Sequence, residues 1–243
     1  QTIKSYKEDI ESFYSYIFSI GKDITEVDIH LIRNYLSNEL ENGKKKTTCC
    51  RRISALKHFF RFLKSNDIIK EDCFVFIHSP KKEIKYPDVL YLEQIEELFE
   101  KNKQRDDEFK IRDQAIIELL YASGVRVSEL VNIKLSDIDM RGRTIRVLGK
   151  GSKERLVMFS KSCQQTLMQF IREDRDKFLA NNKMDFNVEY LFLNKFGKQL
   201  TTRGVEFILK QIEEKCNMHI GLYPHLFRHT FATHLLEGGA DLR

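Results

Sequence analysis

Residues 1–79 carry apolar side chains at the spacing of helices. The first such set is Ile10, Phe13, Tyr14 and Ile17. Positions three and four apart share one face of a helix, so this spacing predicts a helix over residues 6–20. A second helix is predicted over residues 27–40, begun by a Thr25 cap, and a third from after Gly43 to about residue 64. Residues 67–76 are expected to form one more short helix, so this part is predicted to be entirely helical.

The pattern changes at "HSPKKEIKYPD", residues 78–88, which holds two prolines and several lysines and has no apolar period. Proline and charge without periodicity are typical of an exposed connection. We therefore predict a linker over residues 80–88, between a helical first domain at 1–79 and a second domain at 89–243.

The second domain mixes two kinds of pattern. Helical spacing predicts helices over residues 91–101, 111–124, 161–179, 202–216 and in the last stretch, 223–243. Residues 143–159 alternate apolar and polar side chains around a glycine-rich turn, which predicts a β-hairpin, and "EYLFLN", 189–194, is expected to form a short strand. The fold class is therefore mainly α with a small antiparallel β-sheet.

Composition narrows the functional classes. The 41 Lys and Arg against 36 Asp and Glu give +5, so a nucleic-acid partner has to be argued from where the charge lies. The five cysteines form no C-x-x-C pair, which favours reduced thiols over disulfides or zinc. No apolar run is long enough to cross a bilayer, and the start carries no signal-peptide pattern. We expect a cytoplasmic protein with no membrane partner.

The third predicted helix and the residues leading into it are strongly basic. Between Gly43 and Asn66 there is no Asp or Glu, while the Lys and Arg residues are Lys44, Lys45, Lys46, Arg51, Arg52, Lys57, Arg61 and Lys64. A helix face of this charge would attract a phosphate backbone and bind it in a salt-dependent way. The alternative is an ordinary solvated helix face. The complete absence of acidic residues favours nucleic acid.

Candidate chemistry is concentrated in the second domain. Arg126 follows the glycine that ends a helix, and Glu129 lies one helical turn further on. Lys150 stands between two glycines at the tip of the predicted hairpin, where it could reach a substrate phosphate. His225 and Arg228 are three apart on the last helix. Arg126, Glu129 and Lys150 also have ordinary interpretations, namely an arginine paired with a carboxylate, a capping glutamate and a solvated lysine.

The last helix also carries His229 and His234. His225 and His229 have the i, i+4 spacing of two zinc ligands, but Leu, Phe and Arg lie between them, and Arg228 would repel a metal ion. We therefore reject a metal site and assign His229 and His234 to packing or hydrogen bonding.

Two arginines, a lysine and a histidine, without a carboxylate cluster for magnesium, suit a phosphodiester substrate. Forked guanidinium groups can hold the nonbridging oxygens and neutralise developing charge without a metal. Transfer at phosphorus needs mainly that and a proton for the leaving oxygen.

Three segments in this order, "GVRVSEL", "LGKGSKERLV" and "HLFRHTFATHLLEGGADLR", resemble the motifs of the tyrosine recombinases, and most of all those of the Xer-type recombinases that resolve bacterial chromosomes. The resemblance extends over essentially the whole chain, since the basic helical domain is similar to the family's SAM-like core-binding domain. One departure is Phe227, where the family usually has a smaller aliphatic residue, and we expect it to face away from the chemistry.

The resemblance implies a role for each matching residue. Arg126 and Arg228 would clamp the scissile phosphate, Lys150 would be the general acid for the 5′ oxygen, and His225 would assist proton transfer. Glu129 would support the site rather than react. Arg203, in the "LTTRG" stretch before a helix that enters the DNA major groove, would contact phosphate.

The resemblance also implies a reaction. A recombinase of this kind binds a double-stranded recombination site, cleaves it through a 3′-phosphotyrosyl link, and exchanges strands in a homo- or heterotetramer without metal, cofactor or ATP. The nucleophilic tyrosine and a last histidine or tryptophan would lie past Arg243, so this chain is expected to bind DNA without cleaving it. Three alternatives stay open: integration or excision of a mobile element, a noncatalytic DNA-binding relative, and a helical scaffold.

Overall fold

The computed structural model describes residues 2–78, 88–149, 151, 153–181 and 188–240. The chain divides into two compact units, Gln1–Lys85 and Tyr86–Arg243, and each contains its own cluster of buried apolar side chains. The units are therefore described separately. Within the described ranges, no helix is both long and apolar enough to cross a membrane.

The first unit is helical, as predicted. Its helices are α1 (Thr2–Ser19), α2 (Ile29–Glu41) and α3 (Lys46–Ser65), with 3-10 helices at Ile24–Glu26 and Cys73–Phe76. Aromatic rings hold them together: Phe13 of α1 makes edge contacts with the rings of Tyr35, Phe60 and Phe74.

Two local predictions in the first unit were wrong. Thr25 does not begin α2; the side chain of Asp28 does so by accepting a hydrogen bond of 2.7 Å from the backbone N–H of Leu31. Thr25 instead donates to Asp23, which caps the short 3-10 helix before α2. A carboxylate is present at each helix start, and carboxylates are at least as good N-caps as threonine. Of residues 67–76, only the last four are helical, in the 3-10 form.

The second unit contains most of the elements. They are α4 (Leu92–Lys103), α5 (Lys110–Ser123), α6 (Val127–Leu130), a 3-10 helix (Leu135–Asp137), β1 (Ile138–Asp139), β2 (Thr144–Leu148), β3 (Glu154–Met158), α7 (Lys161–Gln169), a π-helical turn (Phe170–Asp174), α8 (Arg175–Ala180), α9 (Thr202–Lys215) and α10 (Pro224–Glu237). The mainly helical fold with a small antiparallel sheet is confirmed.

The predicted hairpin is confirmed as β2 and β3. The sheet order is β1-β2-β3, all antiparallel, and Val147 of β2 lies opposite Arg155 of β3. The strand expected at 189–194 does not form, because these residues make only the isolated bridges Lys134–Tyr190 and Leu193–Gln199.

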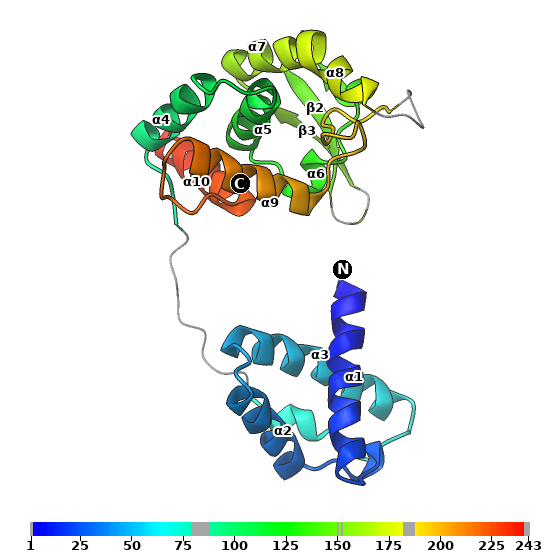
Figure 1. Cartoon of the computed structure of the whole chain (residues 1–243). Helices are drawn as coiled ribbons and strands as arrows, with labels where there is room; N and C mark the ends of the chain where they lie inside the picture. The colour runs from blue at the N-terminus through cyan, green and yellow to red at the C-terminus, as the bar shows by residue number, and fades with distance from the viewer. Residues whose placement is uncertain (1, 79–87, 150, 152, 182–187, 241–243) are drawn as a thin grey trace. The chain divides into compact units, whose positions relative to one another are not determined.

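Helix α5 occupies the middle of the second unit. Helices α4, α7, α9 and α10 all pack against it, and β3 contacts it as well (Figure 1). Ten of its fourteen residues are buried and none is fully exposed, which is expected of a helix surrounded by other elements. Since α10 packs on α5, the end of α5 lies beside α10, and this neighbourhood carries the candidate chemistry.

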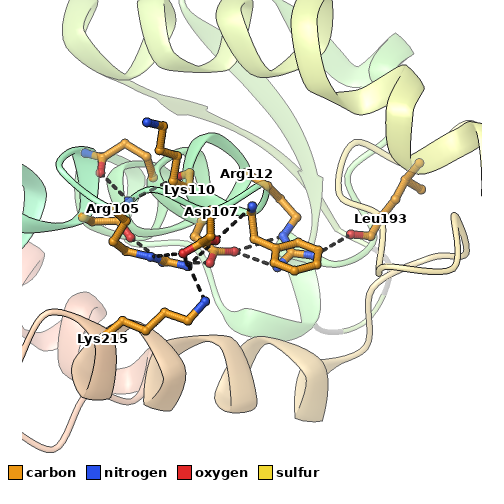
Figure 2. Close-up of polar contacts among 10 residues, drawn as sticks. Arg105, Asp107, Lys110, Arg112, Leu193 and Lys215 are labelled. Atoms are coloured by element: carbon orange, nitrogen blue, oxygen red, sulfur yellow. Dashed lines mark hydrogen bonds and ion pairs between the residues drawn. The ribbon is translucent and has the colours of Figure 1, made fainter.

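A buried polar network fastens the start of α5 to α9 (Figure 2). Arg105 donates to Asp107 at 2.9 Å and to Asp113 at 3.0 Å, and Asp113 also accepts from Arg112. Lys215, in the last turn of α9, donates to Asp107 at 3.1 Å. Asp107 therefore links the loop between α4 and α5 to the end of α9.

Candidate functional site

The site begins where α5 ends. Gly124 caps α5 with φ +57°, a left-handed conformation that glycine adopts without strain. A Cβ atom at this position would also clash with the ring of Phe231 on α10. Glycine is thus required both to turn the chain toward Arg126 and to let α10 approach α5.

Glu129 is the centre of an ion cluster. Arg126 stands at the N-cap of α6, and its backbone N–H and its Nη1 each donate to Glu129 at 2.9 Å. Arg155, on β3, donates both Nη1 and Nη2 to the two oxygens of the same carboxylate at 2.8 Å. The Glu129 side chain is 4 % exposed, while those of Arg126 and Arg155 are 47 % and 36 % exposed.

These contacts fix the charge of Glu129. Burial would raise the pKa of this carboxyl, but hydrogen bonds from Arg155 and Arg126 outweigh burial and lower the pKa to about 2. The same pairing raises the pKa of Arg155. Glu129 is therefore an anion at neutral pH.

Arg228 completes the cluster from α10. Its Nη1 donates to the backbone oxygen of Gly124, so it lies at the C-terminal end of α5. Burial lowers the pKa of Arg228, and the nearby positive charge of Arg126 lowers it further. Three guanidinium groups thus gather around one carboxylate, which leaves an excess of positive charge suited to an oxyanion.

The histidines of α10 differ in their surroundings. His225 is exposed one turn before Arg228, with its ring centroid 6.4 Å from that of the exposed His229. His234 is bonded through Nδ1 to the hydroxyl of Tyr121 at 3.0 Å. Phe227 is fully buried in the core.

Lys150 lies outside the described residues. The two residues on either side of the hairpin turn, Gly149 and Lys153, are described and are called the hairpin neck here. The Gly149 N–H donates to the backbone oxygen of Lys153 at 2.8 Å. The proposed role of Lys150 thus rests on the sequence.

The predicted DNA-binding set needs one correction. Arg52 is directed into the first unit, where it donates to the Tyr35 hydroxyl at 2.7 Å and pairs with Glu39, leaving its side chain 11 % exposed. Arg51 pairs with the buried Asp9 but stays 43 % exposed. The acidic partners lie on α1 and α2, so the charge run in α3 alone did not reveal them. Arg52 therefore has a structural role in the first unit, and its contact with DNA is less well supported by the fold than that of the exposed basic residues.

The other basic residues remain available to a ligand. Lys57 is half-buried, and the exposed ones are Lys44, Lys45, Lys46, Arg61 and Lys64. Arg203 is exposed in the first turn of α9. Their contact with DNA stays a prediction.

Sequence reasoning missed Arg155. The residue was part of the "GSKERLV" segment, but its partner Glu129 is 26 positions away. In the structure Arg155 alternates with Glu154 and Leu156, which are exposed, and so belongs to the inner face of the hairpin. The sequence carried no signal of this placement, because the apolar Leu156 would be expected on an inner face before Arg155. A charged side chain on an inner face is costly to bury unless it pairs with a group of opposite charge.

The cluster can bind an oxyanion, and the described residues contain no group of three or more side chains that could hold a metal ion. Residues 88–243 match the phage integrase family, and residues 1–67 match the phage integrase N-terminal SAM-like domain. The chain therefore belongs to the phage integrase family.

Within the phage integrase family, the chain is similar to the XerC tyrosine recombinases. Along its whole length the chain is 41 % identical to the tyrosine recombinase XerC of Staphylococcus epidermidis and 41 % identical to that of Bacillus pumilus, and it spans 79 % of each of those proteins. The predicted resemblance to Xer-type tyrosine recombinases is confirmed.

Solved structures agree on the fold. A XerH site-specific recombinase bound to a palindromic difH substrate aligns with a TM-score of 0.78 at 20 % identity, over 99 % of this chain and 70 % of that one. XerA recombinase aligns with a TM-score of 0.55 at 26 % identity, over 99 % and 79 %.

Proposed function

We propose that this chain is the DNA-binding and phosphate-binding part of a site-specific recombinase that cleaves and rejoins duplex DNA through a 3′-phosphotyrosyl link. The observation that carries this proposal is the meeting of Arg126 and Arg228, from α6 and α10, at the end of α5. Two forked cations in one place match the two nonbridging oxygens of a phosphodiester. Two proteins that are 41 % identical along the whole chain are XerC tyrosine recombinases.

In this proposal each residue has one task. Arg126 and Arg228 hold the scissile phosphate, and His225, one turn from Arg228, assists proton transfer. Lys150 protonates the departing 5′ oxygen. By resemblance to the family, the attacking tyrosine is assigned to a position beyond Arg243. Strand exchange takes place in a tetramer on DNA, in the cytoplasm.

The test is a nicked suicide substrate incubated with the full-length protein. A covalent protein–DNA adduct supports the recombinase. DNA binding without an adduct would instead identify a noncatalytic DNA-binding relative, and the recombinase proposal would be abandoned.

Arg228→Ala in the full-length protein is expected to reduce adduct formation by a factor of about 100 or more, because one of the two guanidinium groups on the phosphate is removed. Duplex binding, measured by gel shift, is expected to change little, because most phosphate contacts lie elsewhere. A comparable loss of binding would show that Arg228 acts mainly by holding Gly124.

Chromosome dimer resolution is the role we propose, supported by the similarity to XerC proteins along the whole of this chain. Integration or excision of a mobile element is the second candidate, favoured by the fold of the Tn1549 transposon integrase, which aligns with a TM-score of 0.74 over 90 % of this chain and 76 % of that one at 20 % identity. A deletion strain that accumulates chromosome dimers would support the first role, and one that resolves them normally would exclude it.

A further inference from the structure

Arg155 and Arg126 do not share Glu129 equally. Arg155 donates to both carboxylate oxygens at 2.8 Å, in the forked geometry that is strongest between guanidinium and carboxylate. The Arg126 side chain reaches only one of these oxygens, through Nη1 at 2.9 Å. The second hydrogen bond between this pair comes from the Arg126 backbone, which would persist if the guanidinium moved.

Arg155 also ties the hairpin to α6. It lies opposite Val147 on β3, and a Cβ atom built on Gly149 would stand 3.3 Å from its Nη1. The guanidinium therefore lies beside the neck of the hairpin, directly before position 150. Its two bonds to Glu129 hold this neck against α6, the helix that Arg126 caps.

The charge balance depends on this pairing. With both residues present, Arg155 and Glu129 cancel, and Arg126 and Arg228 keep their charge for a ligand. Without Arg155, the buried Glu129 would have Arg126 as its bonded cation, and a phosphate would have to compete with that carboxylate for Arg126.

We propose that Arg155 is a positioning residue of the recombination site: it neutralises Glu129, so that Arg126 is free to bind the scissile phosphate, and it anchors the hairpin neck to α6. The proposal rests on the function proposed above. Arg155 acts through Glu129 and makes no contact with the phosphate itself.

The test measures the effect of Arg155→Gln twice, once in the wild-type protein and once in a Glu129→Gln background. The quantity measured is the initial rate at which the full-length protein forms a covalent adduct with a nicked suicide substrate. Arg155→Gln alone is expected to slow the reaction about tenfold or more, the size of effect typical of supporting residues. In the Glu129→Gln background the same change is expected to cost less than about threefold, because no carboxylate remains to capture Arg126.

Arg146→Gln is the matched control. Arg146 is an arginine of β2 that is bonded to Asp137 at 2.9 Å and projects from the other face of the hairpin. The control is expected to retain the wild-type rate. Arg155→Lys keeps the positive charge but not the two-bonded geometry of the guanidinium, and its rate is expected to fall less than that of Arg155→Gln. If Arg155→Gln does not fold, Arg155→Lys takes its place in the comparison.

Other outcomes would overturn the proposal. An equal loss in both backgrounds would mean that Arg155 contacts the phosphate directly, and an unchanged rate would mean that it has no role. If the wild type forms no adduct, the proposed recombinase function is refuted, while the role of Arg155 in phosphate binding is still testable. The same variants of this chain are then titrated with inorganic phosphate and followed by NMR. Arg155→Gln is expected to weaken phosphate binding less in the Glu129→Gln background, and an equal loss in both backgrounds refutes the role of Arg155.

Discussion

Glu129 is a buried carboxylate whose stability contribution can be measured directly. Its pKa falls from 4.5 to about 2 in the folded protein, since hydrogen bonds from Arg155 and Arg126 outweigh its burial. A lowered folded pKa gives stability that is complete above the unfolded value and is lost as the pH falls through the folded value. The window is therefore from about pH 5 down to about pH 2.

We expect Glu129→Gln to lower the free energy of unfolding by about 3 kcal/mol at pH 7, and this difference to shrink toward zero as the pH falls to about 2. Urea unfolding of wild type and variant at several pH values measures it. Glu206→Gln, at an exposed position of α9, is the control and should give a small difference at every pH. A difference that stays constant with pH would contradict the pairing.

For single residues, the sequence predicted contacts between residues that are close together in the chain. The helix stop at Gly124 and the one-turn spacing of Arg126 and Glu129 predicted a guanidinium beside a carboxylate, and the structure has that pair. It could not identify contacts made by folding. Arg155 meets Glu129 only because the hairpin lies against α6, and Arg52 meets Glu39 only because α3 packs on α2.

Between elements, Asp107 is the link that holds α9 to the start of α5. Burial would raise its pKa, but hydrogen bonds from Lys215 and Arg105 outweigh this and lower it. Asp107→Ala is expected to lower the free energy of unfolding by about 2 kcal/mol, because Arg105, 5 % exposed, loses one of its two carboxylate partners.

Lys215→Ala should cost less than about 1 kcal/mol, since that pair is partly exposed, and Asp106→Ala, at an exposed neighbouring position, is the control. Thermal or urea unfolding measures all three. If Lys215→Ala cost as much as Asp107→Ala, the bond to α9 would carry the effect rather than the buried arginine.

Element prediction succeeded where periodicity decided the structure and failed where packing did. The apolar stripes of α3 and α9 and the alternation of β2 and β3 located these elements closely, whereas α1 begins at Thr2, four residues before the predicted start. Residues 189–194 are as apolar as a strand, yet Arg175 binds the backbone oxygen of Tyr190 at 2.8 Å, an oxygen that would otherwise be free for a neighbouring strand. The π-helical turn at Phe170–Asp174 has no signal in the periodicity.

For the whole chain, the separate cores mean that the basic helix and the arginine cluster belong to different folding units. If the cluster binds phosphate and α3 binds the duplex, as proposed, each of these two roles can be impaired by mutation without the other. Residues 1–67 and 88–243 also match separate domains of the family, which is consistent with this division of tasks.

The salt dependence of duplex binding tests the role of α3. Lys57, Arg61 and Lys64 recur along this helix at i, i+4 and i+7 and can follow one phosphate strand. Replacing all three by Gln is expected to make the slope of log K against log salt shallower by about 0.9 for each phosphate that the variant no longer neutralises. Fluorescence anisotropy with this chain at several salt concentrations measures the slope.

The matched control replaces Lys4, Lys7 and Lys22 by Gln, which removes the same charge from exposed positions elsewhere in the first unit. If α3 binds the backbone, the control keeps nearly the wild-type slope, because counterions are released only where cations meet phosphates. Equal changes in both triple variants would mean that net charge, not this helix face, attracts DNA. A slope near zero in the wild type would identify the first unit as a helical scaffold.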